Sequence, residues 1–230
     1  MKFLFESNEK MNGTYFLWEN RINVYNKKEL PDNININQIL DSISSILPSK
    51  FLSSIDSIYV GEFDSLKKRE VDSVYQDGAI YVVPSYIINQ EELRRNIIHE
   101  IAHSVEEENS LEIYGDSKVE QEFIRKRMIL LDRLESLGYD VPEREVFLDS
   151  DYTPELDMYF YKEVGYPLMS SITSGIFSSP YGATSLREYF ANSFEEYYLG
   201  DTASLKKMSP KAYEKINKLS KEEENFYGRF

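Results

Sequence analysis

Both histidines of this chain lie in one pentapeptide, His99-Glu100-Ile101-Ala102-His103. Apolar residues recur every four positions from Leu93 to Val105, which predicts a long helix over 91–108 with one buried face. Side chains four residues apart share a helix face, so both imidazoles can reach the same metal ion. The rest of the chain must therefore fold around a buried helix that carries a metal site.

Glu100 follows the first histidine and lies about 100° round the predicted helix. A carboxylate there can address a water in the open coordination position of a zinc ion, which lowers the pKa of that water. We therefore expect Zn²⁺ as cofactor, His99 and His103 as ligands, and Glu100 as the catalytic base. The alternative is two unrelated surface histidines, but a chain with only two histidines rarely shows this spacing by accident.

Composition narrows the choice of the third metal ligand. The chain has no cysteine and no third histidine, which excludes thiolate and three-histidine sites. A catalytic zinc usually has three protein ligands, so we expect a carboxylate as the third, ahead of a tyrosine or a backbone group. The 40 acidic residues leave several possibilities on later helices. These are Glu120, Glu122, Glu188 and Glu195.

Charge and hydropathy set the expected partners and location. The 26 basic and 40 acidic residues give a net charge of −14, which argues against binding to nucleic acid or an anionic membrane surface. The N-terminus lacks the apolar run of a signal peptide, and no run approaches the ~20 residues of a membrane span. We expect a cytoplasmic protein by default, with export or delivery by another route as the alternative.

The order of strand and helix signals indicates an α+β fold. Strand patterns occupy 14–26, 55–63 and 79–87, with an amphipathic helix at 36–46 between the first two. Helical patterns dominate from residue 91 onwards. We expect a single domain over 1–230, with a small N-terminal mixed sheet and helices over about 1–108 and a mainly helical lobe over about 109–230.

Within the helical lobe, apolar spacing predicts helices from Val119 to a cap at Gly138, over 185–199 and over about 209–223. The stretch 151–184 has no clear periodicity and is expected to be irregular. Two charged runs are expected to be solvated helix surfaces. They are Glu106-Glu107-Glu108 and Arg125-Lys126-Arg127.

Residues 181–198, YGATSLREYFANSFEEYY, resemble the second motif of the zinc metalloproteases related to anthrax lethal factor and the Pro-Pro endopeptidases. In that family a tyrosine precedes the third zinc ligand, a glutamate, by seven positions, as Tyr181 precedes Glu188. The resemblance implies a zincin-like, gluzincin-type fold with the active-site helix between two lobes. It also implies that Glu188 is the third zinc ligand and that the phenol of Tyr181 hydrogen-bonds the oxyanion.

The chain departs from the family pattern in two places. The family usually has a second carboxylate four residues after the ligand glutamate, where this chain has Asn192. A side chain there is expected to hydrogen-bond a zinc-bound histidine, and an uncharged amide predicts weaker zinc affinity but not a dead site. Residues 110–165 make the spacing between the motifs long, so we expect an inserted helical element there.

Together these features predict a zinc-dependent metalloendopeptidase that binds a protein or peptide substrate in extended form. The strand at 79–87 is expected to be either a plain core strand or an edge strand that pairs with substrate. In the second case Tyr81 and Val83 are its substrate-binding residues. The alternative is a zinc-binding, catalytically weak or inactive protease-like scaffold, or an interaction module of a toxin or phage component.

Overall fold

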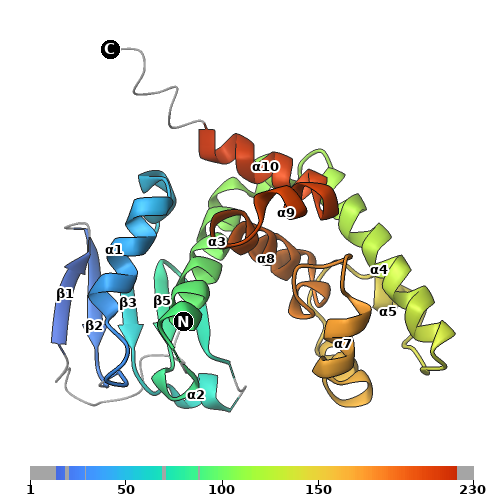
Figure 1. The fold of residues 1–230 in the computed structure, drawn as a ribbon, viewed down its shortest axis with the longest axis horizontal. Coiled ribbons are helices and arrows are strands. Elements are labelled where there is room, and N and C mark those ends of the chain that lie inside the picture. The colour runs from blue at the N-terminus through green and yellow to red at the C-terminus, as the bar shows by residue number, and fades with distance from the viewer. Residues whose placement is uncertain (1–13, 19–20, 29, 69–70, 88, 222–230) are drawn as a thin grey trace. The chain divides into compact units, whose positions relative to one another are not determined.

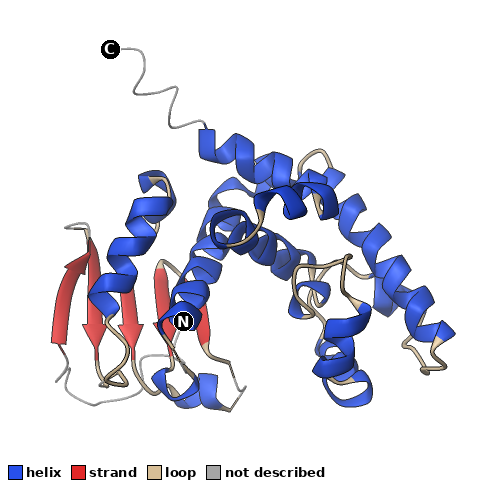
Figure 2. Cartoon of the chain, viewed as in Figure 1, coloured by secondary structure: helices blue, strands red, loops and turns tan. Residues whose placement is uncertain are grey.

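The computed structural model divides into two compact units, Met1–Val105 and Glu106–Phe230. The strands that the structure describes lie in the first unit, and the described part of the second unit is helical (Figures 1 and 2). This confirms the predicted α+β class with a small mixed sheet followed by a mainly helical part. The structure describes residues 14–18, 21–28, 30–68, 71–87 and 89–221, with side chains from residue 21 onwards.

The first unit is built on a five-stranded sheet in the order β1-β2-β3-β5-β4. The central strands β2, β3 and β5 run parallel, whereas β1 is antiparallel to β2 and β4 is antiparallel to β5. Asp77 and Gly78 join β4 to β5 with φ angles of 48° and 79°, a left-handed turn that favours glycine. The strands are Thr14–Trp18, Ile22–Asn26, Ser57–Val60, Ser73–Gln76 and Ala79–Val82.

The two faces of this sheet carry different side chains because neighbouring residues on a strand point to opposite faces. Paired Val24, Ile58 and Ile80 are fully buried on one face. Helices α1 (Ile36–Ile46) and α3 (Gln90–Tyr114) cross in front of the sheet in Figure 1, and both present buried leucine and isoleucine side chains. The apolar core of this unit therefore holds the start of α3 in place.

The opposite face carries a stack of three tyrosines, one from each parallel strand. The ring of Tyr59 lies between those of Tyr25 and Tyr81, with centroid distances of 4.9 and 5.2 Å. Phe63 meets Tyr81 edge-on, just before the short helix α2 (Asp64–Lys67). This aromatic packing adds to the apolar area that stabilises the sheet.

Of the two alternatives for the strand at 79–87, the core strand is confirmed and the sheet edge is wrong. Strand β5 lies between β3 and β4, and it ends at Val82 because Pro84 begins a short 3₁₀ helix. Tyr81 and Val83 are only 5% and 0% exposed, so they belong to the core and not to a substrate-binding surface. The edge beside β5 is formed instead by β4, which the sequence analysis did not identify.

The helices of the second unit confirm three of the predicted segments and add several short ones. The stretch 151–184, expected to be irregular, contains α6, a π-helical turn and α7. Helix α3 is longer than predicted and is kinked at Asn109. The helices after α3 are α4 Lys118–Ser136, α5 Arg144–Leu148, α6 Pro154–Met158, α7 Tyr166–Ile172, α8 Leu186–Leu199, α9 Thr202–Met208 and α10 Pro210–Lys221.

Helix α8 is the central helix of the second unit. It contacts α4, α9 and α10, and its Tyr189, Phe190 and Phe194 are almost completely buried. The rings of Phe123 on α4 and of Phe177 pack against Tyr189. Among the described residues, no helix combines the length and the apolar character needed to cross a bilayer.

Candidate metal centre

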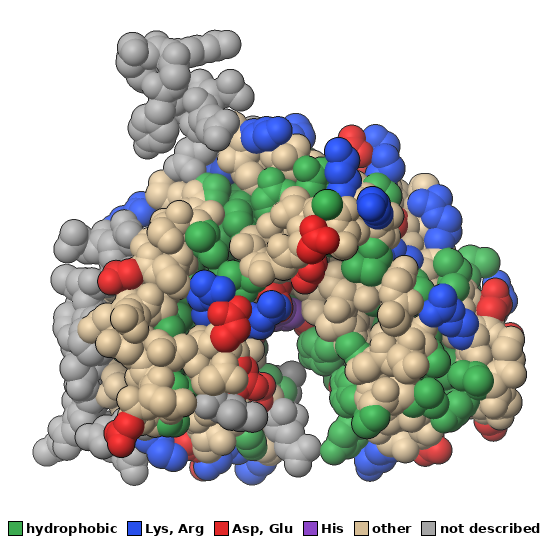
Figure 3. Space-filling model, in the orientation of Figure 1, with side chains coloured by type: hydrophobic (Ala, Val, Ile, Leu, Met, Phe, Trp, Pro, Cys, Tyr) green, Lys and Arg blue, Asp and Glu red, His purple; other side chains and the backbone are tan. Residues whose placement is uncertain are grey.

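Helix α3 places the two histidines one turn apart on the same face. The imidazole centroids of His99 and His103 are 4.9 Å apart, with ring planes at 85°. The intervening Ile101 and Ala102 are fully buried, which fixes the rotation of the helix. His103 is 6% exposed and His99 is half-buried, and histidine atoms are visible at the surface in Figure 3. The histidine pair is thus rigidly held and still reachable.

Glu188 lies in the first turn of α8. The Ser185 hydroxyl oxygen caps this helix by accepting a hydrogen bond from the Glu188 backbone N–H at 3.2 Å. The buried residues that follow, Tyr189 and Phe190, fix how the helix is rotated. The local sequence therefore fixes the backbone position of Glu188 through a helix cap and an apolar anchor.

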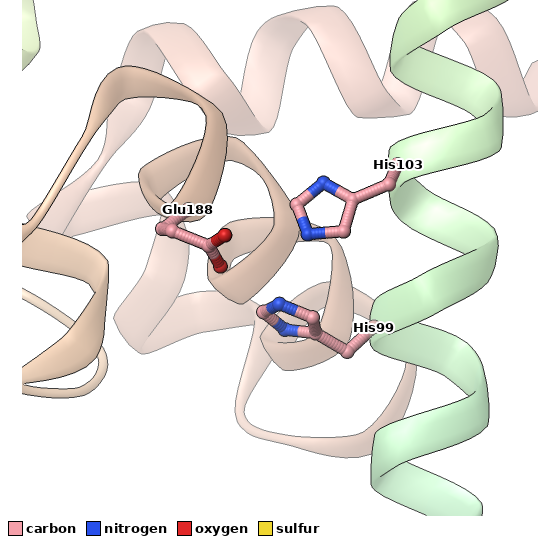
Figure 4. Close-up of side chains that lie close together, drawn as sticks. All are labelled: His99, His103 and Glu188. Carbon is pink, nitrogen blue, oxygen red and sulfur yellow. The ribbon is translucent and has the colours of Figure 1, made fainter. Parts of the chain in front are cut away.

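His99, His103 and Glu188 come together in the structure. Each offers one ligand atom, and these atoms lie within 4.8 Å of one another. Figure 4 shows the two imidazoles on α3 and the Glu188 carboxylate directed toward one another. Two imidazole nitrogens and one carboxylate oxygen form a donor set typical of catalytic zinc, so these residues fit that ion.

The competing carboxylates named by the sequence analysis are outside this group. Glu122 is buried and accepts hydrogen bonds from the Tyr189 hydroxyl and from the backbone N–H groups of Lys211 and Ala212. It therefore caps the start of α10. Glu120 accepts a hydrogen bond from the Ser150 hydroxyl at 3.2 Å.

Glu100 points from α3 toward strand β4. Its carboxylate is almost fully buried, with 5% of the residue exposed. Oε1 accepts a hydrogen bond from the Ser73 hydroxyl at 2.8 Å, and Oε2 accepts one from the Tyr75 backbone N–H at 2.6 Å. These two donors fix the orientation of the carboxylate.

Tyr181 begins the 3₁₀ turn η4 (Tyr181–Ala183), which packs against α8. The residue is 38% exposed, so its phenol is accessible to a ligand. Partial burial, with the negative charges of Glu188 and Asp157, raises the pKa of Tyr181 well above its ordinary value. The phenol is therefore neutral at physiological pH and can donate a hydrogen bond to a developing negative charge.

Asn192 connects α8 to the turn that carries Tyr181. Its Nδ2 donates to the Glu188 carbonyl at 2.9 Å, and its Oδ1 accepts a hydrogen bond from the Ser179 hydroxyl. That hydroxyl oxygen in turn accepts from the Gly182 N–H at 3.2 Å. The amide thus has a structural role in the second unit, and its predicted contact with a zinc-bound histidine stays a prediction.

Glu106 was expected at a solvated helix end, which is wrong. It is 9% exposed, accepts a hydrogen bond from the Tyr114 hydroxyl at 2.7 Å and pairs with the Arg187 Nε at 3.2 Å. Glu107 and Glu108, by contrast, are exposed as predicted. The missed signal is spacing, because Glu106 lies three residues after His103, on the buried side of α3.

The expected surface run at 125–127 is also wrong for two of its three members. Arg125 is exposed, but Lys126 and Arg127 are 6% and 0% exposed. Arg127 donates hydrogen bonds to backbone carbonyls in two separate segments of the unit. The acceptors are Phe147 at 2.5 Å, Asp149 at 3.0 Å, Ala183 at 2.7 Å and Thr184 at 2.5 Å.

Through these bonds Arg127 ties the η4 turn and the start of α8 to α4. Lys126 lies beside it and donates to the Ile176 carbonyl at 2.5 Å and the Ser209 hydroxyl at 2.8 Å. A sequence signal existed, because both cations lie three and four residues after the buried Phe123, on the apolar side of α4. Three consecutive basic residues suggested a solvated surface, so this helical spacing from Phe123 was overlooked.

No family model, no curated protein and no solved structure matches the chain.

Proposed function

We propose that this chain is a zinc-dependent metalloendopeptidase with a zincin-like, gluzincin-type active site. The observation that supports this most strongly is the convergence of His99, His103 and Glu188, whose ligand atoms lie within 4.8 Å of one another. The three donors match a catalytic zinc site in type and number. A zinc ion bound there supplies a Lewis acid for the scissile carbonyl and lowers the pKa of a bound water.

The remaining residues of the site have distinct chemical tasks. Glu100, one residue after His99, accepts a proton from the attacking water and returns it to the leaving amine. The neutral phenol of Tyr181 donates a hydrogen bond to the oxyanion that forms as the carbonyl is attacked. The substrate is a protein or peptide bound in extended form, since attack on a main-chain carbonyl requires an accessible backbone.

A second candidate function is a zinc-binding scaffold with little or no turnover, such as an interaction module of a toxin or phage component. The observation in its favour is Asn192, an amide at the position where the resembling proteases have a carboxylate. Its polar groups hold the Ser179 and Glu188 backbone region together, which serves a structural role equally well. Zinc would then stabilise the fold without hydrolysis.

Cleavage of fluorescein-labelled casein, with and without a chelator, separates the two functions. We expect the zinc-loaded chain to cut casein and Glu100→Ala to lose roughly 10²–10⁴-fold in rate while it keeps one zinc per chain. Glu107→Ala, which removes an exposed carboxylate from the same helix, is the matched control and should cut at the wild-type rate. Full activity in Glu100→Ala refutes the mechanism, and tight zinc with no cleavage of casein or a broad peptide library favours the scaffold.

A further inference from the structure

Among the strands that the structure describes, β4 forms one edge of the sheet, and the hydrogen-bond register identifies the groups along it. The Val83 N–H donates to the Asp72 carbonyl at 2.8 Å, which makes these two residues a hydrogen-bonded antiparallel pair. Such pairs alternate along a ladder, so Val74 opposite Tyr81 also faces β5. The backbone groups of Ser73 and Tyr75 must then point away from β5, toward the outer edge.

The carboxylate of Glu100 lies at this outer edge. Oε2 accepts the outward Tyr75 N–H at 2.6 Å, and Oε1 accepts the Ser73 hydroxyl at 2.8 Å. Ser73 is 9% exposed and Glu100 is 5% exposed, so both bonds lie out of bulk water. Hydrogen bonds to a buried carboxylate are stronger than neutral ones, and two donors define the plane of the group.

We infer that Ser73, with the Tyr75 amide, is a positioning residue for Glu100. The inference rests on the proposed function, in which Glu100 is the base. A carboxylate oxygen has two lone pairs, so each oxygen of Glu100 keeps one after accepting its bond from β4. The edge strand therefore orients the base without consuming its capacity to accept a proton from water.

A consequence for substrate binding follows from the same bond. An extended substrate that adds to a sheet edge uses outward amides and carbonyls of the edge strand. The Tyr75 amide is already bonded to Glu100, so a substrate chain does not pair with β4 through that group. Substrate binding at this edge must use other contacts.

Kinetics of zinc-loaded Ser73 variants test the role in catalysis. With a quenched peptide spanning the main casein cleavage site, Ser73→Ala should lower kcat roughly tenfold and leave KM and zinc stoichiometry unchanged. Ser73→Thr keeps the hydroxyl and should restore most of kcat. Ser85→Ala, which removes a serine bond to another carboxylate of this unit, Glu62, is the control and should have no effect on kcat.

Amide hydrogen exchange tests the geometry without any need for turnover. In the zinc-loaded chain, Glu100→Ala should speed exchange of the Tyr75 amide at least tenfold and leave the Val74 amide, which faces β5, unchanged. Equal exchange of Tyr75 in wild type and variant overturns the inference. The inference is also overturned if Ser73→Ala keeps the wild-type kcat while Glu100→Ala is inactive. If Glu100→Ala itself is active, the proposed function is refuted instead.

Discussion

Replacing Arg127 by methionine is the most informative single test of what holds the η4 turn and the start of α8 in place within the second unit. The side chain is fully buried and donates four hydrogen bonds, all of 3.0 Å or less, to backbone carbonyls. Burial lowers the pKa of Arg127 to about 9, so the guanidinium is still protonated at neutral pH. Methionine preserves most of the volume but removes every donor.

The expected loss of stability follows from the backbone carbonyls that Arg127→Met leaves without a donor. Removing the donor from four largely buried carbonyls costs about 3–5 kcal/mol in total, because one buried acceptor that loses its partner costs about 1–3 kcal/mol. For a chain of this length that corresponds to roughly 6–20 °C in Tm. Arg127→Lys should fall between wild type and methionine, since one ammonium group cannot reach four carbonyls arranged for a planar fork.

Urea unfolding in the presence of a chelator measures this without a contribution from metal binding. Because the chain has two units, two probes are needed. The single tryptophan, Trp18, lies in β1 and reports on the first unit, whereas circular dichroism at 222 nm reports mainly on the helices. The Arg127→Met transition seen by circular dichroism should move to lower urea, while the tryptophan transition moves less.

Arg125→Met is the matched control, because it removes an exposed arginine two residues away on the same helix. It should change the free energy of unfolding by no more than about 0.5 kcal/mol. If Arg127→Met is as mild as Arg125→Met, the carbonyl cluster contributes little and the reasoning is wrong. The same holds if the loss appears only in the tryptophan signal.

Three further variants test other parts of the structure. Glu188→Gln should weaken zinc binding at least tenfold in a competition titration, whereas the control Glu195→Gln should bind zinc as wild type does. If the two variants bind zinc equally well, Glu188 is not the third ligand. Glu122→Gln should lower the free energy of unfolding in urea by about 2–3 kcal/mol, because a neutral amide replaces the carboxylate that caps α10. An unchanged urea midpoint of unfolding would contradict that capping role. Burial lowers the pKa of Lys126 to about 8 from an ordinary value of 10.5, so the unfolded chain binds more protons between those values. Lys126 should therefore contribute a rise in stability of about 1–2 kcal/mol from pH 7.5 to 9.5. In urea titrations the rise of Lys126→Met should be smaller by that amount, because Arg127, whose pKa burial lowers to about 9, still contributes.

Much of the fold was predictable because it rests on short-range patterns. The isoleucine spacing of α1, the stripe on α3 and the Asp77-Gly78 turn are local features, and each produced the expected element. Strand β4 was missed because four residues, Ser73–Gln76, are too few to show alternation. That omission also displaced the edge of the sheet by one strand.

The candidate metal ligands also differ in how far the sequence could predict them. His99 and His103 follow from their spacing on one helix, which needs no knowledge of the tertiary structure. Glu188 is distant in sequence from the two histidines, and composition could not distinguish it from Glu120, Glu122 and Glu195 as the third ligand. Only the resemblance singled it out, and the gathering of its carboxylate with the two imidazoles supports that choice. A ligand set that spans distant segments depends on packing, which periodicity does not reveal.

Arg127 shows most directly why the rest could not be predicted. Its acceptors are main-chain carbonyls of Phe147, Asp149, Ala183 and Thr184, and every residue type has such a carbonyl. No side-chain pattern in those segments can therefore indicate an arginine partner. A charged residue within a basic run is expected to be solvated. Arg127 instead holds the η4 turn, which carries Tyr181, and the segment that leads into α8, which carries Glu188. Mutations at such a buried cation should therefore impair the candidate site as strongly as they impair the fold, although Arg127 is not itself one of the site's ligands.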